Sequence, residues 1–431
     1  MASRHLESQQ GERLKIPADW RAMSFGDVAI KRAAPVSVDS ASFYREIGIR
    51  SHGRGVFHKD SVSGDSLGDK RVFWVRANCL VFNIVFAWEG AVAVTGHSED
   101  GMIASHRFPM FSSGSDNLVE VEFLRRFFQT PLGVRLLGEA SPGGAGRNRT
   151  LTQKLLHEVP VPVPPLGEQK KIAAILDAVD DAIEGTQAVI DQLQVVKKAM
   201  MAELLTRGLP GRHTRFKQTE IGEVPDSWTV ERLAAVANVQ TGVAKGKNVQ
   251  NGVDVPYLRV ANVQDGHVDL SEVKTIVVER GLVGRYSLKA GDVLFTEGGD
   301  ADKLGRGCVW RAQIDPCLHQ NHVFAVRTNG NKLLPEFLGY WAASPGGRAY
   351  FLDCAKQTTN LASINSTQLK AFPVPLPTME EQAKIVESID AVDHLLRIER
   401  EFADHVAGVR AALMSALLTG ELRVTPYEAT P

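Results

Sequence analysis

Basic and amide side chains gather on several glycine-containing segments, the first of which follows a short apolar stretch that begins at Phe43. Its glycines, Gly53 and Gly55, permit a close approach of the backbone to a ligand. The arginine, histidine and lysine side chains around them supply N–H donors for phosphate oxygens and base edges. A second segment of this kind spans residues 141–149. A solvated hairpin loop is the alternative interpretation of the first segment. The candidate contact residues in this half of the chain are Arg50, His52, Arg54, Lys59, Arg147, Asn148 and Arg149.

Two further segments of this kind occupy residues 239–247 and 298–307, and a third segment, residues 357–365, lacks glycine but carries three amide side chains. Asparagine and glutamine can read adenine through paired hydrogen bonds, and arginine can read guanine. The first segment ends in Gly-x-x-x-Gly-Lys, one residue shorter than a Walker A loop, and lacks the serine or threonine that would hold magnesium, so we reject a nucleotide site. A solvated loop without any ligand contact is an equally good interpretation of each of these segments. The candidates here are Lys245, Lys247, Lys303, Arg306, Gln357, Asn360 and Asn365.

Residues arranged for catalysis are sparse. The sequence has no Gly-x-Gly-x-x-Gly segment for a methyl donor, no Asn-Pro-Pro-aromatic motif and no His-Glu-x-x-His. The triplet from Glu272 to Lys274 has the acid-x-lysine form of a nuclease core, but such triplets arise often by chance. Asp315, His319 and His322 lack an evident fourth metal ligand. We therefore predict no catalytic residue, no metal site and no cofactor in this chain.

These segments lie on a chain that repeats itself. The stretch Val159-Pro-Val-Pro-Val-Pro-Pro-Leu-Gly-Glu-Gln recurs as Phe372-Pro-Val-Pro-Leu-Pro-Thr-Met-Glu-Glu-Gln. Gln169 thus corresponds to Gln382, and the same offset in residue number carries Thr206, at the end of a Leu-Leu-Thr segment, onto Thr419. No insertion therefore separates the two copies. Such a repeat indicates a tandem architecture in which a globular part and a long helix each occur twice.

Each copy predicts a long helix with a defined start. The alternating prolines favour an extended backbone and exclude helix before Leu166 and before Thr378. Acidic Glu168 and Glu381 fall in the first turn, where they offset the helix dipole. Apolar residues then recur at alternating spacings of four and three, which is a heptad seam, with polar interruptions at Thr186, Lys197 and their equivalents. The predicted pairing residues are Ile172, Leu176, Val179, Ile183, Ile190, Leu193, Ile385, Ile389, Val392, Leu396, Val406 and Leu413.

We expect the two helices to pack on each other in antiparallel fashion, because the domain between them must bring the chain back. The alternative is that each amphipathic helix packs only on its own domain. Polar residues within such a seam commonly fix the register.

Composition narrows the class of protein. The 431 residues suit two domains with connectors, and 44% hydrophobic and 23% charged residues are typical of a soluble protein. No apolar run is long enough to cross a membrane, so we expect a cytoplasmic protein. The four cysteines form no Cys-x-x-Cys pair, which indicates free thiols. The net charge of −1 argues, taken alone, against nucleic-acid binding, although a local basic surface remains compatible with it.

The duplicated Pro-x-Pro-x-Pro-Pro-Leu-x-Glu-Gln phrase, each copy followed by a long helix, resembles the specificity subunit of type I restriction–modification enzymes. The segments Phe216-Lys-Gln-Thr-Glu-Ile-Gly-Glu-Val-Pro-Asp-Ser-Trp228 and Gly291-Asp-Val-Leu-Phe295 resemble that family too. The resemblance covers nearly the whole chain, from about Leu14 to Val424. It departs slightly at Thr378 and Met379, which replace Pro-Leu of the first copy.

The resemblance implies an α+β fold with two β-rich target-recognition domains in tandem, each followed by a long helix. The two helices would form an antiparallel coiled coil with pseudo-twofold symmetry. Each domain would read one half of a bipartite, asymmetric site in double-stranded DNA. The implied partners are two methyltransferase subunits, which use S-adenosylmethionine, and restriction/translocase subunits, which use ATP and magnesium. The competing hypothesis is a coiled-coil scaffold that assembles partners without reading DNA.

These arguments predict where the parts of the chain begin and end. The expected segments are a disordered N-terminus over 1–12, a first domain over 13–165, a spacer helix over 166–208, a second domain over 209–377, a C-terminal spacer helix over 378–424 and a tail over 425–431.

Overall fold

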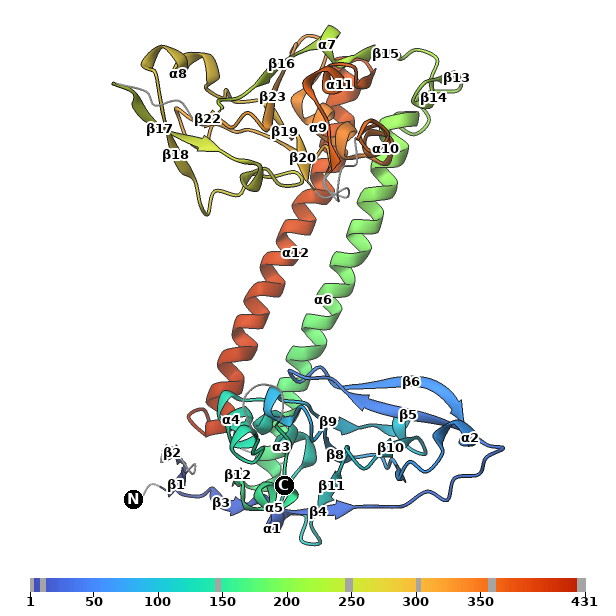
Figure 1. Cartoon of the computed structure of the whole chain (residues 1–431), viewed down its shortest axis with the longest axis vertical. Coiled ribbons are helices and arrows are strands. Elements are labelled where there is room, and N and C mark those ends of the chain that lie inside the picture. The colour runs from blue at the N-terminus through green and yellow to red at the C-terminus, as the bar shows by residue number, and fades with distance from the viewer. Residues whose placement is uncertain are drawn as a thin grey trace, which may run out of the picture. The chain divides into compact units, whose positions relative to one another are not determined.

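The computed structural model describes residues 4–7, 13–143, 149–244, 251–299, 304–355 and 362–424. Within it the chain packs as two compact units (Figure 1). Unit 1 consists of residues 1–187 and 402–431, and unit 2 consists of residues 188–401. Each unit therefore contains one globular part, part of the first long helix and part of the second.

Unit 1 contains two four-stranded sheets, with the strand orders β6-β5-β10-β7 and β4-β11-β8-β9. Its core is rich in phenylalanine: the ring of Phe25 meets those of Phe82, Phe111 and Phe128 edge to face. The strands are β1 (Arg4–Glu7), β2 (Arg13–Ile16), β3 (Arg21–Ser24), β4 (Ala29–Arg32), β5 (Phe43–Ile49), β6 (Val56–Ser63), β7 (Val72–Trp74), β8 (Cys79–Phe82), β9 (Val92–Thr95), β10 (Ile103–Ser105), β11 (Met110–Ser113) and β12 (Pro160–Val163). The helices before the first long one are α1 (Phe25–Val28), α2 (Gly64–Leu67), η1 (Ala87–Glu89), η2 (His97–Glu99), α3 (Val121–Phe128), α4 (Pro131–Glu139) and α5 (Gln153–Glu158).

Unit 2 contains a four-stranded sheet of order β16-β23-β19-β21 and a three-stranded sheet of order β18-β17-β22. Phe372 stacks on Trp341 and on Phe351 in its core. The strands are β13 (Phe216–Thr219), β14 (Gly222–Pro225), β15 (Thr229–Arg232), β16 (Ala237–Thr241), β17 (Val253–Leu258), β18 (Lys274–Val278), β19 (Val293–Thr296), β20 (Gly298–Gly299), β21 (Gly307–Val309), β22 (Leu318–His319), β23 (Val323–Thr328), β24 (Ala362–Ser363) and β25 (Pro373–Leu376). The helices before the second long one are α7 (Leu233–Val236), η3 (Val260–Asn262), α8 (Arg280–Tyr286), α9 (Pro335–Ala343), α10 (Pro345–Cys354) and α11 (Ser366–Lys370).

The helix pairs α3–α4 and α9–α10 are equivalent in the two units. In each pair a hydroxyl caps the second helix: Thr130 Oγ1 accepts from the Gly133 N–H at 3.0 Å, and Ser344 Oγ accepts from the Gly347 N–H at 3.2 Å. A proline follows each cap at the first helical position, where its missing N–H costs nothing. The helical segment that begins at Val121 is therefore broken at Pro131, and the one that begins at Pro335 is broken at Pro345.

Among the described strands, each proline segment forms a short strand that pairs with a strand near the start of its own unit. β12 runs antiparallel to β3, and β25 runs antiparallel to β15. Since proline cannot donate to a ladder, it is tolerated in such two-stranded edges. The long helices begin directly afterwards, α6 over Leu166–Arg207 and α12 over Met379–Thr419, as the prolines predict.

The heptad seam is visible in the burial of the two long helices. Seven of the predicted pairing residues are buried, namely Ile172, Leu176, Ile190, Ile385, Ile389, Val392 and Leu396. The other five are half-buried, namely Val179, Ile183, Leu193, Val406 and Leu413. In unit 1, Leu176 shares a buried cluster with Leu417, and in unit 2, Leu205 shares one with Ile389. The start of each helix thus packs near the end of the other within one unit, while a continuous coiled coil across both units stays a prediction.

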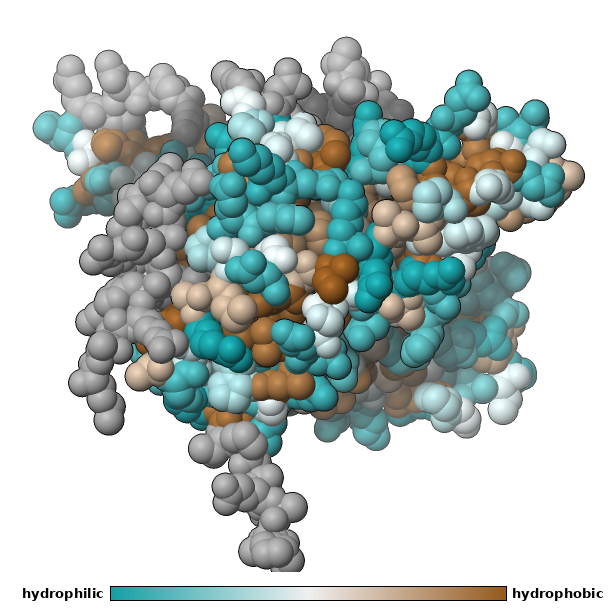
Figure 2. Space-filling model, turned by 90° about the horizontal axis from the view of Figure 1, so that it is seen from below, coloured by the Kyte–Doolittle hydropathy of each residue, from teal (hydrophilic) through white to brown (hydrophobic). Residues whose placement is uncertain are grey.

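Two segment boundaries differ from expectation. The second long helix ends at Thr419 rather than 424, because Gly420 adopts a φ of 77° that L-residues disfavour. Residues Arg4–Glu7, expected to be disordered, pair as β1 with β2. In the described part of the chain, no helix is long and apolar enough to cross a membrane. On the face seen in Figure 2, hydrophobic residues occur in small groups between hydrophilic ones, which is ordinary for a protein surface.

Candidate nucleic-acid interface

The Glu-Gln pair in each copy of the repeated sequence hydrogen-bonds the start of a long helix to residues outside that helix. In unit 1, the indole Nε1–H of Trp20 donates to Glu168 Oε2 at 3.1 Å, and Arg423 donates to the same carboxylate at 2.8 and 2.9 Å. Glu168 is only 2% exposed, and a carboxylate so deeply buried needs such partners. Arg423 follows the end of α12, so this contact joins the start of one long helix to the end of the other.

Unit 2 repeats the arrangement with one change of partner. Trp228 Nε1–H donates to Glu381 Oε2 at 3.2 Å, and His213 Nε2 lies 2.7 Å from Glu381 Oε1. His213 and Arg212 follow the end of α6, as Arg423 follows α12. The tryptophans at the two domain entrances, Trp20 and Trp228, therefore have the same role.

Gln169 and Gln382, which follow these glutamates, hydrogen-bond to the segments that precede α3 and α9. Gln169 Oε1 accepts from the Glu120 N–H at 2.8 Å, and its amide donates to the Leu118 and Pro164 carbonyls. Gln382 makes the same three contacts, with the Leu334 N–H and the carbonyls of Lys332 and Pro377. Both side chains are fully buried, so the repeated phrase positions α3 in one unit and α9 in the other.

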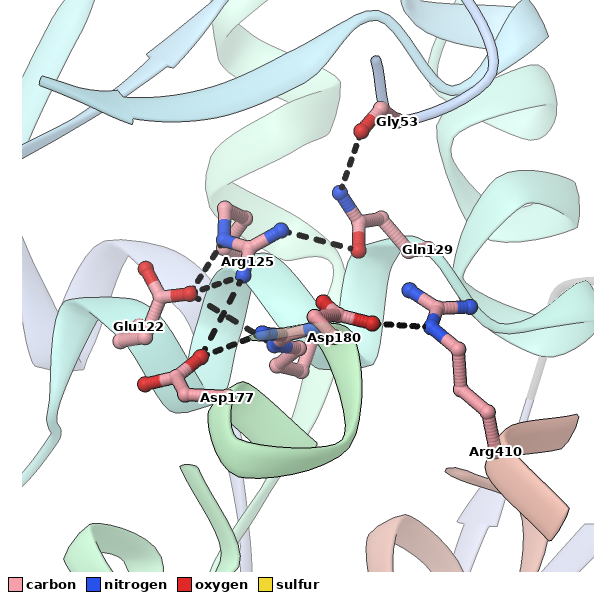
Figure 3. A network of polar contacts seen from close by, with 8 residues as sticks. Gly53, Glu122, Arg125, Gln129, Asp177, Asp180 and Arg410 are labelled. Atoms are coloured by element: carbon pink, nitrogen blue, oxygen red, sulfur yellow. Dashed lines mark hydrogen bonds and ion pairs between the residues drawn. The ribbon is translucent and has the colours of Figure 1, made fainter. Parts of the chain in front are cut away.

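A charged network fastens α3 to both long helices in unit 1 (Figure 3). Arg126, whose side chain is 2% exposed, bonds Asp177 and Asp180 on α6, and Asp180 also bonds Arg410 on α12. Burial disfavours the charged guanidinium, but the bonds to Asp180 and Asp177 outweigh it and raise the pKa of Arg126. Burial likewise opposes ionisation of Asp180, yet the bonds from Arg410 and Arg126 hold its pKa below the usual range.

In the equivalent network of unit 2, the phenol of Tyr340 takes the place of the Arg126 guanidinium. The hydroxyl of Tyr340 on α9 donates to Asp390 and, at 2.9 Å, to Asp393, while Lys197 Nζ lies 2.5 Å from Asp393. In the repeat, Asp180 corresponds to Asp393, and Lys197 corresponds to Arg410. Two of the polar interruptions of the seam, Lys197 and Arg410, are therefore cationic partners of the repeated aspartate. A role of these contacts in fixing the register stays a prediction.

The depressed pKa of Asp180 predicts an acid-sensitive contribution to stability. A carboxyl whose pKa is lowered on folding stabilises the fold fully above its unfolded value, about 3.9, and the contribution is lost as the pH falls through the folded pKa. Asp180→Asn should therefore lower the thermal midpoint of the full chain at pH 7. The difference between wild type and variant should shrink towards pH 3. A difference that stayed constant over that range would contradict the assignment.

The first predicted contact segment is a tight hairpin loop between β5 and β6. His52, Gly53 and Gly55 adopt φ values of 59°, 66° and 76°. The His52 N–H donates to the Glu89 carbonyl at 2.8 Å, and the Gly53 N–H donates to the Gly90 carbonyl at 3.0 Å. The loop is therefore held against η1 by its backbone, which leaves the side chains of Arg50, His52 and Arg54 exposed.

The second segment of unit 1 lies beside the same place. Arg149 is exposed, and its guanidinium carbon lies 5.6 Å from the centroid of the Trp88 ring in η1. The Leu151 N–H donates to the Ile84 carbonyl, which anchors the end of the segment near η1. The structure therefore brings Arg149 and the 50–55 loop to one region of unit 1. Lys59, by contrast, lies on β6 and is paired with Glu46 at 3.2 Å. Arg147 and Asn148 lie outside the described residues.

The three candidate segments of unit 2, residues 239–247, 298–307 and 357–365, have ends that lie near residues 319–322. The Val243 N–H donates to the His319 carbonyl at 2.8 Å, and the Glu297 N–H donates to the His322 carbonyl at 2.9 Å. The Ile364 N–H donates to the Glu297 carbonyl at 2.7 Å, beside the β20–β24 pairing. Backbone hydrogen bonds therefore link the start of the second segment to the end of the third, and both this pair and the first segment are bonded to residues 319–322. The candidates Lys245, Lys247, Lys303, Gln357 and Asn360 lie outside the described residues.

Two candidates of unit 2 have contacts within the protein. Arg306 donates to Gln264 Oε1 at 2.7 Å. Asn365 caps α11: its Oδ1 accepts from the Gln368 N–H, and Gln368 Oε1 accepts from the Asn365 N–H, both at 2.9 Å. The pattern of an asparagine three residues before a glutamine is typical of a capping box, and it could have indicated this structural role in the sequence.

The possible catalytic groups have ordinary partners. Glu272 is exposed and pairs with Arg259 and Lys274, which lower its pKa. Residues 64–68 have the Gly-x-Ser-x-Gly spacing, but Ser66 Oγ lies 2.8 Å from the hydroxyl of Ser63, which is no base for a serine nucleophile. No cluster of three potential metal ligands occurs among the residues that the structure describes.

The cysteines are free. Burial raises the pKa of Cys308 and of Cys317 to about 12, so both thiols stay protonated at neutral pH.

Some residues of this region were not predicted from the sequence. Trp88 and Glu89 support the 50–55 loop, and Gln129 at the end of α3 contacts it. A comparison of repeat positions could have suggested the α3 residues, since Arg126 and Tyr340 occupy nearly the same place in the repeat and both face the repeated aspartates. Nothing local in the sequence indicates Trp88 or Gln129 as supports.

Comparison with known proteins agrees with this architecture. Residues 61–195 and 225–406 match the family described as "Type I restriction modification DNA specificity domain". The chain is 26% identical over 432 residues to the type I restriction enzyme MjaVIII specificity subunit of Methanocaldococcus jannaschii, with 95% of each chain covered.

Solved structures share the fold. A chain from work on complex assembly and conformational transition of the type I R-M system aligns with a TM-score of 0.58 and 18% identity, over 95% of this chain and 100% of that one. The S subunit of a type I restriction-modification system from M. genitalium aligns with a TM-score of 0.54 and 12% identity, over 93% of this chain and 96% of that one.

Proposed function

Since this chain belongs to the type I restriction modification DNA specificity family, we propose that it is the sequence-reading subunit of such a system. Each unit reads one half of a bipartite, asymmetric site in double-stranded DNA. The long helices set the gap between the halves. The chain selects the site and performs no chemical step itself.

The observation that carries this proposal is that the same helix contacts occur in both units, whereas the candidate DNA-contacting loops differ. The helix contacts recur residue by residue, as Glu168 and Gln169 do in Glu381 and Gln382, whereas the candidate contact loops of the two units differ in sequence. A common frame with two distinct surfaces suits the reading of two different half-sites, because base contacts specify sequence while the frame fixes their register. The exposed guanidiniums of Arg50, Arg54 and Arg149 suit phosphate or guanine contacts.

The proposed partners follow from the family. Two methyltransferase subunits dock on the helical part of the chain and methylate DNA with S-adenosylmethionine. Restriction/translocase subunits, which consume ATP and bind magnesium, complete the assembly in the cytoplasm. This chain holds no cofactor in the proposal.

A methylation map tests the proposal. We would express the chain with its methyltransferase partner in a host lacking type I systems, and map modified bases over the genome. We expect a split motif that appears only when this chain is present. As a control, the methyltransferase would be expressed alone and shown to be folded and to bind S-adenosylmethionine. No motif with both subunits present and assembled would favour a scaffold that does not read DNA.

A further inference from the structure

We propose that Gln129 is a positioning residue that couples the 50–55 loop to α3, and through α3 to the long helices, so that unit 1 discriminates its half-site. This inference rests on the proposed function and adds a specificity-determining residue outside the exposed loops. It concerns the first half-site alone.

The 50–55 loop is held to η1 along one side. Its backbone is held to η1 by the hydrogen bonds of His52 and Gly53, and Ser51 Oγ donates to Glu89 Oε2 at 3.0 Å. One side of the loop borders a cavity of about 560 Å³, which is lined in part by Trp88, Val134 and Met414. A loop beside a cavity lacks packed neighbours on that side, so individual polar contacts weigh more in fixing its position.

Gln129 supplies such a contact from a rigid element. Its Nε2–H donates to the Gly53 carbonyl at 3.4 Å, and its Oε1 accepts from Arg125 at 3.1 Å (Figure 3). A Cβ at position 53 would lie 2.8 Å from Gln129 Nε2, so the glycine backbone rests directly on the amide. Gly53 is favoured by its φ of 66°, and a larger residue there would also displace the Gln129 amide.

The chain of contacts continues to both long helices. Arg125 is paired with Glu122 within α3, and the adjacent Arg126 is bonded to Asp177 and Asp180 of α6. Asp180 in turn bonds Arg410 of α12, which also lines the cavity below the loop. The loop is thus connected to the helices that set the gap by a short series of polar contacts within unit 1.

The described part of unit 2 has no counterpart of this connection. When Arg126 is aligned with Tyr340, Gln129 falls opposite Ala343 and Arg125 falls opposite Gly339. Neither Ala343 nor Gly339 has a side chain that can form the hydrogen bonds of Gln129. In unit 2, Tyr340 connects α9 to α12, but the methyl side chain of Ala343 cannot hydrogen-bond to a loop. Alanine is compatible with this helix position, so Gln129→Ala should fold.

The test measures discrimination rather than affinity. Duplexes carrying the mapped target, with single-base changes in the first or in the second half-site, would be titrated with the full chain assembled with its methyltransferase partner. A substituted base pair in a specific site usually costs several-fold to a hundredfold in affinity. We expect Gln129→Ala to reduce the discrimination ratio at the first half-site by about five- to tenfold, and to leave the ratio at the second half-site unchanged.

Two further variants separate positioning from general damage. Gln129→Glu keeps an acceptor for Arg125 but cannot donate to the Gly53 carbonyl, so it should lose discrimination like Gln129→Ala. Val134→Ala removes a neighbour of the same cavity without a polar contact and should retain discrimination. Full discrimination by Gln129→Glu, or equal losses at both half-sites, would overturn the proposal. A wild-type complex without any sequence preference would instead refute the proposed function.

Discussion

Replacing Arg126 with methionine is expected to destabilise unit 1 by about 2–3 kcal/mol, below the about 3–5 kcal/mol typical of a broken buried ion pair, because Asp177 and Asp180 keep contact with solvent. The variant leaves two carboxylates of α6 without their shared cation. Hydrogen exchange of the full chain should show faster exchange in α3 and in the start of α6. Exchange in α9 and in the end of α6 should stay as in the wild type.

The matched control lies at the equivalent position of unit 2. Tyr340→Phe removes one hydroxyl and leaves Lys197 beside Asp393, so the expected loss is about 1 kcal/mol. It should appear as faster exchange in α9 only. Equal effects of the two variants, or an effect of Arg126→Met spread over both units, would show that α3 is not held mainly by this network.

Replacing Arg50, Arg54 and Arg149 together with alanine is expected to lower DNA affinity by roughly 10³-fold, since three lost charged hydrogen bonds at about 1.5 kcal/mol each cost about 4.5 kcal/mol together. These side chains are exposed in the described structure and lie around one region of unit 1. If all three contact phosphates, the slope of log affinity against log salt should decrease by about three. The measurement is a titration of target DNA at several salt concentrations.

Lys59→Ala provides the comparison for this triple variant. Lys59 was predicted as a contact from the sequence, but its ammonium is paired with Glu46 on the neighbouring strand. Because this pair holds the ammonium on β6, away from the proposed contacts, we expect a loss of affinity of less than about threefold, which corresponds to about 0.6 kcal/mol. If Lys59→Ala weakened binding as much as the triple variant, the DNA surface would lie along β6 rather than at the loop.

The starts and the buried faces of the two long helices could be predicted because their signals are local. Prolines before Leu166 and Met379 exclude helix whatever the rest of the chain does, and the spacing of Leu176 and Ile389 from their neighbours places them on the inner face. The break at Pro131 and the glycines around Arg54 are local signals of the same kind. All of these depend on residues a few positions apart.

The partners of the polar residues were decided by tertiary structure. Glu168 was expected to offset a helix dipole, and it does lie in the first turn, but its carboxylate also accepts the indole N–H of Trp20 from 148 residues away. Asn365, a candidate for base contact, also caps a helix, and no local feature of the sequence indicates that Gln129 contacts a loop 76 residues distant. Periodicity determines which face of an element is buried. It does not determine the rotation and register at which two distant elements meet, and hydrogen bonds depend on that geometry to within a few tenths of an ångström.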